Sequence, residues 1–571
     1  MRFTATPLVH GAATGEILFS KTPLSFWGGI GQETGDIIDH HHPLSGQNIK
    51  GRILVLPSTR GSCSGSLVMI ELLLNKVAPA AIVFRDAEEI VTTGVIVARA
   101  LLGLSIPVLR FSEEGFDVLG LERYLSISDR EIVTAAVPLP LYGSLPSRVP
   151  KLEHDIYLTK EDKCILDGVH GAAASKAMEI LLQYASLQGA KSLGSVSRAH
   201  IDACIYTGPA STMIAQTLLN SDGKVAVPTT LNSISIDQRR WQELGVDKDL
   251  AREANRVAET YVAMGAKNSF TCAPYLLDSP PQSGESIGWA ESNAVVFANS
   301  VLGARTQKYP DLIDVCIALT GRAPLAGAQT EKGRVPRVCV KVSDSVQSIE
   351  AMEDAFYPSL GYAIGKAVGG DIPLITGLET GTKPTISDLK AFGAAFATTA
   401  SAPMFHIAGV TPEAGQFNPT ELPHIKVTED HLRSALNGLA TAKDKSVGLV
   451  SLGNPHFSLE EFARLSELCT GRRKANSVQL IITTSRDVYA KACAAGHISV
   501  IEAFGGEILT DTCWCMISES VIDASVLNLM TNSAKYAHYA PGIVHRGVHF
   551  GSLRECVDAA ERGFIQGLPR K

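Results

Sequence analysis

A loop at residues 57–66, PSTRGSCSGS, constrains the amino-terminal part of this chain more than any other stretch. It follows the apolar run Ile53–Leu56, which is typical of a buried strand, and precedes Leu67–Leu74, whose apolar residues predict a buried helix. The first N–H groups of a helix lack intrahelical partners, and the helix dipole favours negative charge there. A strand, a Gly/Ser turn and a helix start therefore indicate a site for an anion.

Within this loop, Ser62 is the candidate for a catalytic base. A serine hydroxyl is normally too weak an acid to ionise, but a nearby cation and several N–H donors could hold it as an alkoxide. Arg60 would add a fixed fork of donors. The alternative is that the loop is an ordinary turn with a helix cap, and the loop alone does not decide between the two.

Charge and length limit the classes of function. A chain of 571 residues, 45% of them hydrophobic, can bury a large core and should divide into several domains. The net charge of -7 provides no basic surface for nucleic acid or an anionic membrane, so we expect a small polar substrate. The amino terminus carries no apolar segment and no long uncharged apolar run follows, which predicts a cytoplasmic protein.

The cysteines indicate reduced thiols. Their number, eleven, is odd, and they are spread over most of the chain, which argues against a disulfide framework. No CxxC motif occurs, since Cys513 and Cys515 are separated by one residue and the others stand alone. This spacing disfavours a zinc ribbon, but thiolates from distant loops could still share a metal cluster.

The order of apolar segments and turns predicts an α/β protein with two main parts. Residues 1–140 have many short apolar segments and one clear helix, as in a small β-rich α/β domain. Residues 141–152 are rich in Pro, Gly and Ser and are expected to form a linker. Residues 153–571 alternate helices and strands, including an expected strand at Val225–Val227, and should form mostly parallel sheets in more than one lobe.

Polar residues interrupt the apolar pattern of the larger part in several segments, each next to a predicted strand. Such loops are where α/β proteins place their sites. A structural interpretation is also open, because a single Cys or His is often a core residue and because Glu291, Asn293 and Arg305 could form a buried polar network. The segments are CAPYL at 272–276, WAESNAVVFANSVLGART at 289–306, FHIAGVTPEA at 405–414, LGNPH at 452–456 and LTDTC at 509–513.

Taken together, the serine loop and these five segments resemble the aconitase X family over nearly the whole chain. The resemblance implies a small swivelling β-rich α/β domain and a large multi-lobed aconitase-like α/β domain. It also implies an iron–sulfur cluster and the elimination of water from a hydroxylated substrate.

The branch with both domains in one chain, small domain first, dehydrates cis-3-hydroxy-L-proline, and this chain has that order. The resemblance therefore implies conversion to Δ1-pyrroline-2-carboxylate through an enamine. Two alternatives remain: a phosphorylated hydroxy acid such as phosphomevalonate as substrate, as in the branch split into two subunits, or a catalytically inactive aconitase-like binding protein.

The split branch holds its cluster with three cysteines, whose positions correspond here to Cys272, Asn454 and Cys513. Because an amide is a poor iron ligand beside thiolates, the resemblance favours a smaller cluster, such as [2Fe–2S]. Cys63 or Cys515 could replace the missing thiolate, and we favour Cys63 because a cleft between the domains would bring it to the larger part.

The resemblance also assigns roles in the reaction. Ser62 would remove the Cα proton, with Ser66 as the second candidate, while an iron with an open position would coordinate the leaving hydroxyl. The residues expected to bind the substrate are Arg60, Ser66, His200, Asn232, Asn293 and Lys535.

Overall fold

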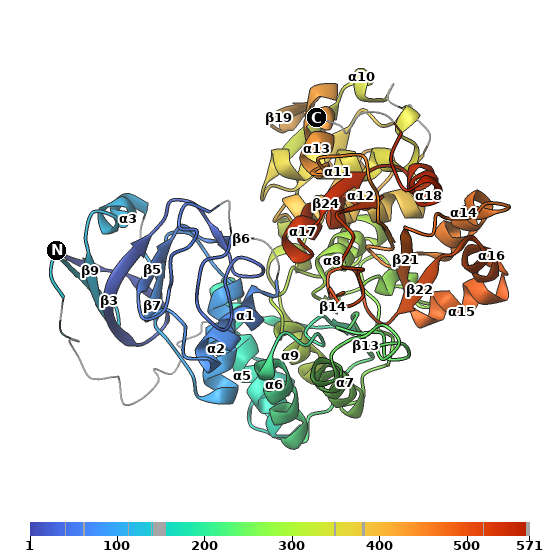
Figure 1. Cartoon of the computed structure of the whole chain (residues 1–571). Helices are drawn as coiled ribbons and strands as arrows, with labels where there is room; N and C mark the ends of the chain where they lie inside the picture. The colour runs from blue at the N-terminus through green and yellow to red at the C-terminus, as the bar shows by residue number, and fades with distance from the viewer. Residues whose placement is uncertain are drawn as a thin grey trace.

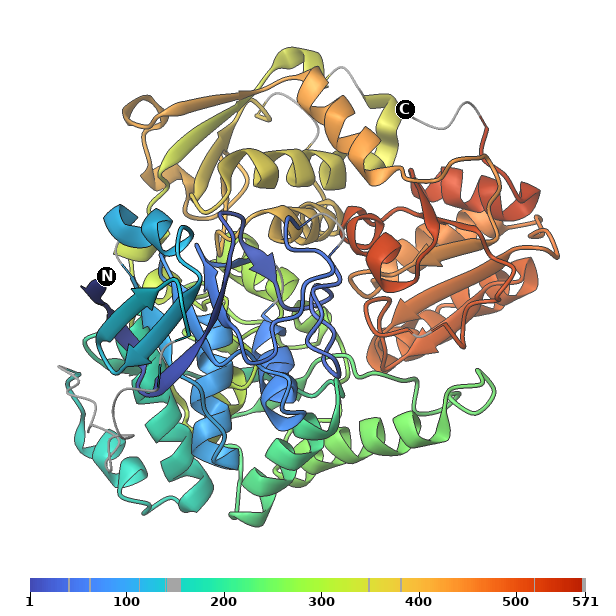
Figure 2. The ribbon, with the colours of Figure 1, turned by 60° about the vertical axis from the view of Figure 1, so that its left-hand side comes forward.

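A computed structural model describes residues 1–39, 42–60, 63–111, 113–138, 140, 156–347, 350–379, 383–517 and 519–566. The chain forms a smaller amino-terminal part and a larger part that surrounds one side of it (Figures 1 and 2). Both are mixed α/β, which confirms the predicted fold class. The predicted linker, 141–152, lies outside the described residues, so the proposed boundary between the two domains stays a prediction.

The amino-terminal part contains an eight-stranded sheet in the order β1-β10-β9-β3-β5-β7-β8-β2. Its central strands β3, β5, β7 and β8 are parallel, and antiparallel strands complete both edges. The strands are β1 Arg2–Thr4, β2 Thr6–Val9, β3 Ala12–Phe19, β5 Ile53–Leu56, β7 Ala81–Phe84, β8 Val108–Arg110, β9 Tyr124–Ser128 and β10 Glu131–Ala135. A separate short pair consists of β4 Leu24–Ser25 and β6 Thr59–Arg60.

Strand β5 is buried on both faces, which explains its uninterrupted apolar sequence. Ile53 and Val55 belong to a core on the face covered by α3, Glu113–Leu119. Leu54 and Leu56 face the other way, toward α1 (Gly65–Leu74) and α2 (Ile90–Leu102). These two helices lie between the sheet and the larger part (Figure 1).

The larger part has three lobes, each built on a parallel sheet, whose strand orders are β13-β12-β14, β18-β17-β16-β19 and β22-β21-β20-β23-β24. The strands are β12 Ala199–Ile201, β13 Thr229–Leu231, β14 Gly288–Trp289, β16 Val338–Val342, β17 Pro373–Thr376, β18 His406–Ile407, β19 His424–Val427, β20 Leu449–Leu452, β21 Gln479–Thr484, β22 Glu507–Thr510, β23 Asn528–Thr531 and β24 Gly547–Phe550. A separate antiparallel pair joins β11 Leu193–Ser195 to β15 Arg322–Pro324.

Helices cover these sheets. The first lobe has α4 Lys160–Leu166, α5 Ala172–Leu187, α6 Pro209–Asn220, α7 Lys248–Ala263, α8 Ser292–Phe297 and α9 Ile313–Thr320. The second has α10 Asp344–Gln347, α11 Phe356–Val368, α12 Ile386–Thr399 and α13 Glu429–Leu439. The third has α14 Leu459–Cys469, α15 Arg486–Ala494, α16 His497–Phe504, α17 Ala534–Ile543 and α18 Leu553–Arg562. Among the described helices, none is both long and apolar enough to traverse a lipid bilayer.

One predicted strand is wrong. Residues 225–227 form no strand, and the strand of this region, β13, begins at Thr229. The reason is that the backbone N–H groups of Val225 and Ala226 donate to the carbonyls of Met264 and Ala318, at or near helix ends, instead of to a neighbouring strand.

The two parts of the chain share one apolar core. Side chains of α1 and α2 pack in the same cluster as side chains of α5 and α6. Polar contacts cross the interface as well: the backbone N–H of Ala210 donates to Glu71 Oε1 at 2.7 Å, and the Tyr184 hydroxyl donates to Glu89 Oε2 at 3.0 Å. Gly208 is needed here, because a Cβ at this position would lie 2.5 Å from the Glu71 carboxylate.

The interface carboxyl of Glu71 gives a pH-dependent prediction. Burial raises the pKa of Glu71 from 4.5 to about 7, so the folded protein holds this proton more tightly than the unfolded chain does. The free energy of unfolding should therefore fall as the pH rises from about 4.5 to about 7. We expect Glu71→Gln to reduce that fall by roughly 1–3 kcal/mol, measured by urea unfolding at pH 5 and pH 8. Glu33→Gln, at an exposed position, is the control, and an equal fall in both variants would contradict the prediction.

Candidate active site

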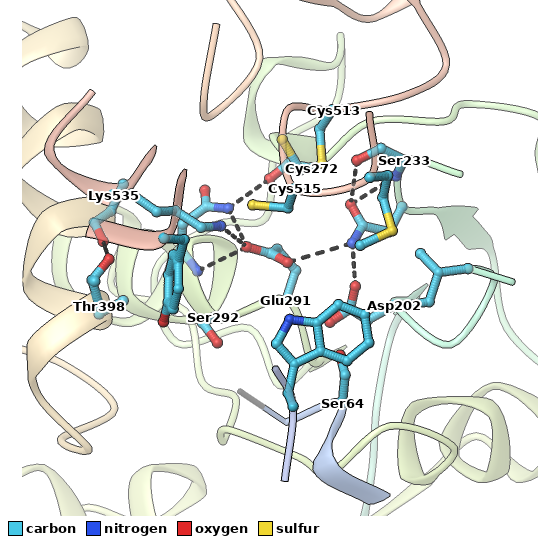
Figure 3. Close-up of a pocket in the computed structure, with 18 of the residues that line it drawn as sticks. Ser64, Asp202, Ser233, Cys272, Glu291, Ser292, Thr398, Cys513, Cys515 and Lys535 are labelled. Carbon is cyan, nitrogen blue, oxygen red and sulfur yellow. Dashed lines mark hydrogen bonds and ion pairs between the residues drawn. The ribbon is translucent and has the colours of Figure 1, made fainter. Parts of the chain in front are cut away.

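A cavity lies where the amino-terminal part meets the three lobes (Figure 3). One part of its wall is polar and carries thiols, and another part is apolar. The polar and thiol residues are Ser64, Asp202, Asn232, Ser233, Cys272, Glu291, Ser292, Asn293, Thr398, Cys513, Cys515 and Lys535. The other lining residues are Trp27, Ile205, Ala394, Ala397, Met516, Tyr539 and Ile543.

Parallel strands place most of the polar residues. Asp202, Asn232 and Glu291 come directly or almost directly after β12, β13 and β14 of the first lobe. In the third lobe, Cys513 follows β22 and Lys535 lies in the first turn of α17, after β23. Because the carboxyl ends of parallel strands meet at one edge of a sheet, the two lobes present these groups to a common cavity.

Three thiols lie together at one end of the cavity: Cys272, Cys513 and Cys515 (Figure 3). Cys272 Sγ accepts a hydrogen bond from the backbone N–H of His456 at 3.3 Å, and Cys515 Sγ accepts one from Asn454 Nδ2 at the same distance. A hydrogen bond joins the Cys513 and Cys515 side chains, and it lowers the pKa of Cys515 to about 6 while raising the pKa of Cys513.

His456 links the two loops that carry Cys272 and Cys513. Its Nε2–H donates to the carbonyl of Thr512 at 2.8 Å, and its Nδ1 accepts from the Thr271 hydroxyl at 3.2 Å. Each threonine immediately precedes one of the cysteines. Burial lowers the pKa of His456 to about 4, so the neutral imidazole that makes both contacts persists through the physiological range.

The thiols are the candidate ligands for the iron–sulfur cluster that the family resemblance implies. Among the described residues, no three His, Cys, Asp or Glu side chains are grouped to hold a single metal ion. A cluster makes a different demand, because its thiolates are shared among more than one iron. Three soft thiol donors on one cavity wall, with the amide of Asn454 beside one of them, suit such a cluster.

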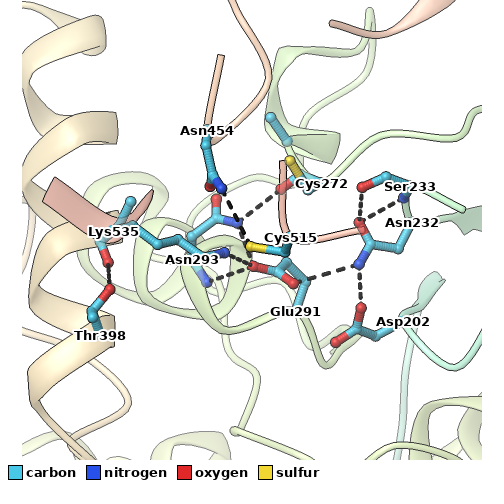
Figure 4. Close-up of polar contacts among 12 residues, drawn as sticks. Asp202, Asn232, Ser233, Cys272, Glu291, Asn293, Thr398, Asn454, Cys515 and Lys535 are labelled. Atoms are coloured by element: carbon cyan, nitrogen blue, oxygen red, sulfur yellow. Dashed lines mark hydrogen bonds and ion pairs between the residues drawn. The ribbon is translucent and has the colours of Figure 1, made fainter. Parts of the chain in front are cut away.

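A polar network centred on Glu291 occupies the middle of the cavity (Figure 4). Glu291 Oε1 accepts from Lys535 Nζ at 2.8 Å and from Asn293 Nδ2 at 2.6 Å, while Oε2 accepts from Asn232 Nδ2 at 3.4 Å. The Lys535 charge lowers the pKa of Glu291 against the effect of burial. Asn293 also donates to the carbonyl of Cys272 at 3.0 Å, so the network reaches the thiol wall.

Removing one member of the Glu291–Lys535 ion pair should destabilise the protein. Both side chains are mostly buried, with 12% and 13% of their surfaces exposed. Removing one charge leaves the other buried without its partner, so we expect Lys535→Met to lower the free energy of unfolding by about 3–5 kcal/mol. The double variant Glu291→Gln/Lys535→Met should regain part of that loss. A urea double-mutant cycle measures the coupling, and additive losses would show that the pair contributes little.

The amino-terminal part contributes Ser64 and Trp27 to the cavity wall. Ser62, the predicted base, lies outside the described residues. Cys63, next to it, is buried and its thiol contacts the Ser292 side chain of the larger part. The start of α1 and the thiols therefore face one crevice between the two parts.

The predicted site residues fall into two groups. Asn232, Asn293, Lys535, Cys272 and Cys513 line the cavity. Arg60, Ser66, His200 and Cys63 are described but are not among the lining residues.

Two of these four contact lining residues, because the Cys63 thiol contacts Ser292 and the His200 side chain contacts Asn232. Arg60 pairs with Asp39 at 2.7 Å near the surface. The Ser66 hydroxyl donates to the carbonyls of Cys63 and Asp311 at 3.0 and 3.3 Å. His200 Nδ1 lies 2.8 Å from the Thr230 hydroxyl, and burial lowers the pKa of His200 to about 4. The thiol that lines the cavity with Cys272 and Cys513 is Cys515, which is hydrogen-bonded to Cys513, whereas Cys63 is not among the lining residues.

The lining residues that sequence reasoning did not propose include Trp27, Asp202 and Ser233, and the central place of Glu291 in the polar network was also missed. Trp27 stands before two glycines, a pattern that also fits a plain turn, and Asp202 and Ser233 each follow a short strand that offered little signal. Arg305 was grouped with Glu291, but its guanidinium pairs instead with Glu331. The 405–414 segment is structural, since Glu413 pairs with the buried Arg334 at 2.7 Å.

The fold and the site define a multi-domain α/β protein with a thiol-walled crevice between a small amino-terminal domain and a three-lobed larger part. Sequence models match four domains in turn: the aconitase X swivel domain over residues 2–135, the first domain over 155–332, the second over 336–437 and the third over 447–562. The chain belongs to the aconitase X family.

Individual relatives agree with this. The chain is 49% identical to the cis-3-hydroxy-L-proline dehydratase of Pseudomonas aeruginosa, over 98% of this chain and 97% of that protein. It is 48% identical to the enzyme of the same name from Hypocrea jecorina, over 99% and 96%. The crystal structure of Thermococcus kodakaraensis aconitase X in its holo-form matches with a TM-score of 0.64 at 31% identity, covering 71% of this chain and all of that one.

Proposed function

We propose that this protein is a hydro-lyase that dehydrates cis-3-hydroxy-L-proline. The observation that carries the proposal is near-half identity to two dehydratases of that substrate along essentially the whole chain, both domains included. The site supports it, because the cavity offers hydrogen-bonding groups, buried charges and soft metal ligands within one crevice.

The reaction balances without an added reactant. The proton leaves Cα, hydroxide leaves C3, and the electron pair of the Cα–H bond becomes the C2=C3 double bond. Water is the second product. The resulting enamine takes a proton at C3 while its nitrogen lone pair forms the C=N bond, and the nitrogen then releases its N–H proton, which gives Δ1-pyrroline-2-carboxylate.

Ser62 is the proposed base for the Cα proton. Its neighbours Cys63 and Ser64 lie at the start of α1, at the crevice, and Ser64 lines the cavity. The N–H groups at the amino-terminal end of α1 and the helix dipole would favour an alkoxide there. Asn232, Asn293 and Lys535 would orient the substrate, and Arg60, Ser66 and His200 would act through the surrounding structure.

Cys272 and Cys513 are the proposed ligands of an iron–sulfur cluster, with Cys515 as the third thiolate in place of the earlier choice, Cys63. The contact between Cys515 and Cys513 supports this change. A [2Fe–2S] cluster held by these three thiolates would keep one coordination position open. When bound, it would supply a Lewis acid for the departing hydroxyl.

The lining favours an amino acid over a phosphorylated acid. Among the described residues of the cavity wall there is no arginine, and the one lysine there, Lys535, is already paired with Glu291. A phosphate dianion would need more donors than this wall supplies.

Turnover by the anaerobically purified protein tests the proposal. We expect cis-3-hydroxy-L-proline to be consumed and pyrroline carboxylate to appear in equal amount, as followed by mass spectrometry. Phosphomevalonate, assayed in parallel, should be inert. A protein that binds iron but leaves cis-3-hydroxy-L-proline unchanged would contradict the proposal.

A further inference from the structure

Asp202 is a buried carboxylate on the cavity wall whose neighbours are mainly acidic. Its Oδ1 accepts from Asn232 Nδ2, and its backbone N–H donates to Asp314 Oδ2 at 2.5 Å. The amide of Asn232 is fixed, because its oxygen accepts from the backbone N–H of Ser233 at 2.8 Å. The Asp202 carboxylate is therefore held in one orientation at the cavity.

The charges around Asp202 are unbalanced. Burial is the largest cause of its raised pKa, followed by repulsion from Asp311, Glu291 and Asp314. Burial and Asp314 raise the pKa of Asp311 to about 8. Of these four carboxyl groups, Glu291 has Lys535 as a partner, and the Asp202 and Asp311 side chains share a hydrogen bond, which requires a proton on one of them. A positively charged group brought into the cavity near Asp202 would relieve this repulsion, whereas an anionic group would add to it.

Trp27 supplies an aromatic surface from the opposite side of the crevice. Its loop is rigid: the Ser25 hydroxyl donates to the Trp27 carbonyl at 2.8 Å, and a Cβ on Gly29 would lie 2.1 Å from the Ser25 carbonyl oxygen. Phe26, the preceding residue, is buried and packs beside Gly65 at the start of α1. The half-buried indole thus lies near Ser64, whose side chain contacts Asp311, the neighbour of Asp202.

We propose that Asp202 and Trp27 form the subsite that recognises the ring ammonium of a cyclic amino acid. The Asp202 carboxylate would accept from the ring NH₂⁺ group, and the indole would pack against the ring methylenes and the adjacent positive charge. The proposal rests on the proposed function for the identity of the substrate. It adds the feature that selects a cyclic amine, and it makes Trp27 and Asp202 determinants of specificity.

Two inhibitors of the same ring size test the subsite in the unmodified enzyme. L-Proline carries the ring ammonium but no hydroxyl to eliminate, and tetrahydrofuran-2-carboxylate has an ether oxygen in place of the nitrogen. If Asp202 forms a hydrogen-bonded ion pair with the ring ammonium, the inhibition constant of L-proline should be about 10–100-fold lower than that of tetrahydrofuran-2-carboxylate. Equal inhibition constants would overturn the proposal.

Substitutions of Asp202 and Trp27 test whether these two residues cause the difference between the two inhibition constants. Asp202→Asn keeps the shape of the side chain and should reduce the preference for L-proline to about two-fold or less. Trp27→Ala should weaken both inhibitors by about 3–10-fold, and Trp27→Phe should restore part of that loss. Trp241→Phe, which alters a tryptophan that does not line the cavity, should change neither constant. Unchanged binding in folded Trp27→Ala would overturn the role of the indole.

Turnover tests the proposed reaction, and the preference between the two inhibitors tests the proposed subsite, so either proposal can fail without the other. An enzyme that dehydrates cis-3-hydroxy-L-proline but binds both inhibitors equally would retain the proposed function and lose the subsite. A protein without turnover that still prefers L-proline would do the reverse. If Asp202→Asn does not fold, as judged by circular dichroism, the inhibitor pair in the unmodified enzyme and the Trp27 variants still decide the question.

Discussion

Replacing Ser62 by alanine should lower turnover of cis-3-hydroxy-L-proline by about 10²–10⁴-fold, because the Cα proton would lose its acceptor. The fold should remain, since the change removes one oxygen. The iron content should also remain, because the proposed thiol ligands lie on the larger part. Steady-state kinetics, thermal unfolding and iron analysis of the same preparation measure the three quantities.

Ser45→Ala is the matched control, because Ser45 is exposed on the same domain. It should retain normal turnover. Ser66→Ala addresses the second candidate for the base, and its effect should be on stability, because the Ser66 hydroxyl is engaged with two carbonyls. Normal turnover by Ser62→Ala would remove Ser62 from the mechanism.

Single replacement of Cys272 or Cys513 by serine should abolish both iron binding and turnover. A hydroxyl is a harder and weaker ligand for iron than a thiolate, so the cluster would be lost or unstable. The visible absorbance of anaerobically purified protein and its iron per chain measure the loss. Full iron content in either variant would exclude that cysteine as a ligand.

Two variants show which cysteine supplies the third thiolate ligand of the cluster. Cys515→Ser should lose iron, whereas Cys63→Ser should keep it, because Cys63 is not among the residues that line the cavity. Cys493→Ser is the control, since Cys493 is exposed. The reverse result for Cys515 and Cys63 would restore the assignment that the sequence favoured.

The sequence predicted well those elements that depend on local pattern. Strand β5 and helix α1 fall where the apolar runs indicated. The expected strand at 225–227 failed because tertiary contacts to helix ends took its backbone groups.

The site was predicted only where motifs were distinctive. Cys272, Asn293 and Cys513 stand in recognisable segments and line the cavity. The choice between Cys63 and Cys515 depends on which thiol lines the cavity, and spacing along the chain does not encode that. The same holds for Arg60, whose partner Asp39 lies twenty-one positions earlier in the sequence. Asp202 and Trp27 became visible only when two distant segments were brought to one cavity.

Because α1, α2, α5 and α6 share one apolar core, the peptide link between the two parts should not be needed to hold them together. Separating the small domain from the larger part would expose hydrophobic surface on both, so a backbone cleaved between them should stay assembled as a non-covalent heterodimer. Two polypeptides expressed side by side should then reconstitute the enzyme, and the peptide link would serve mainly to keep their stoichiometry equal.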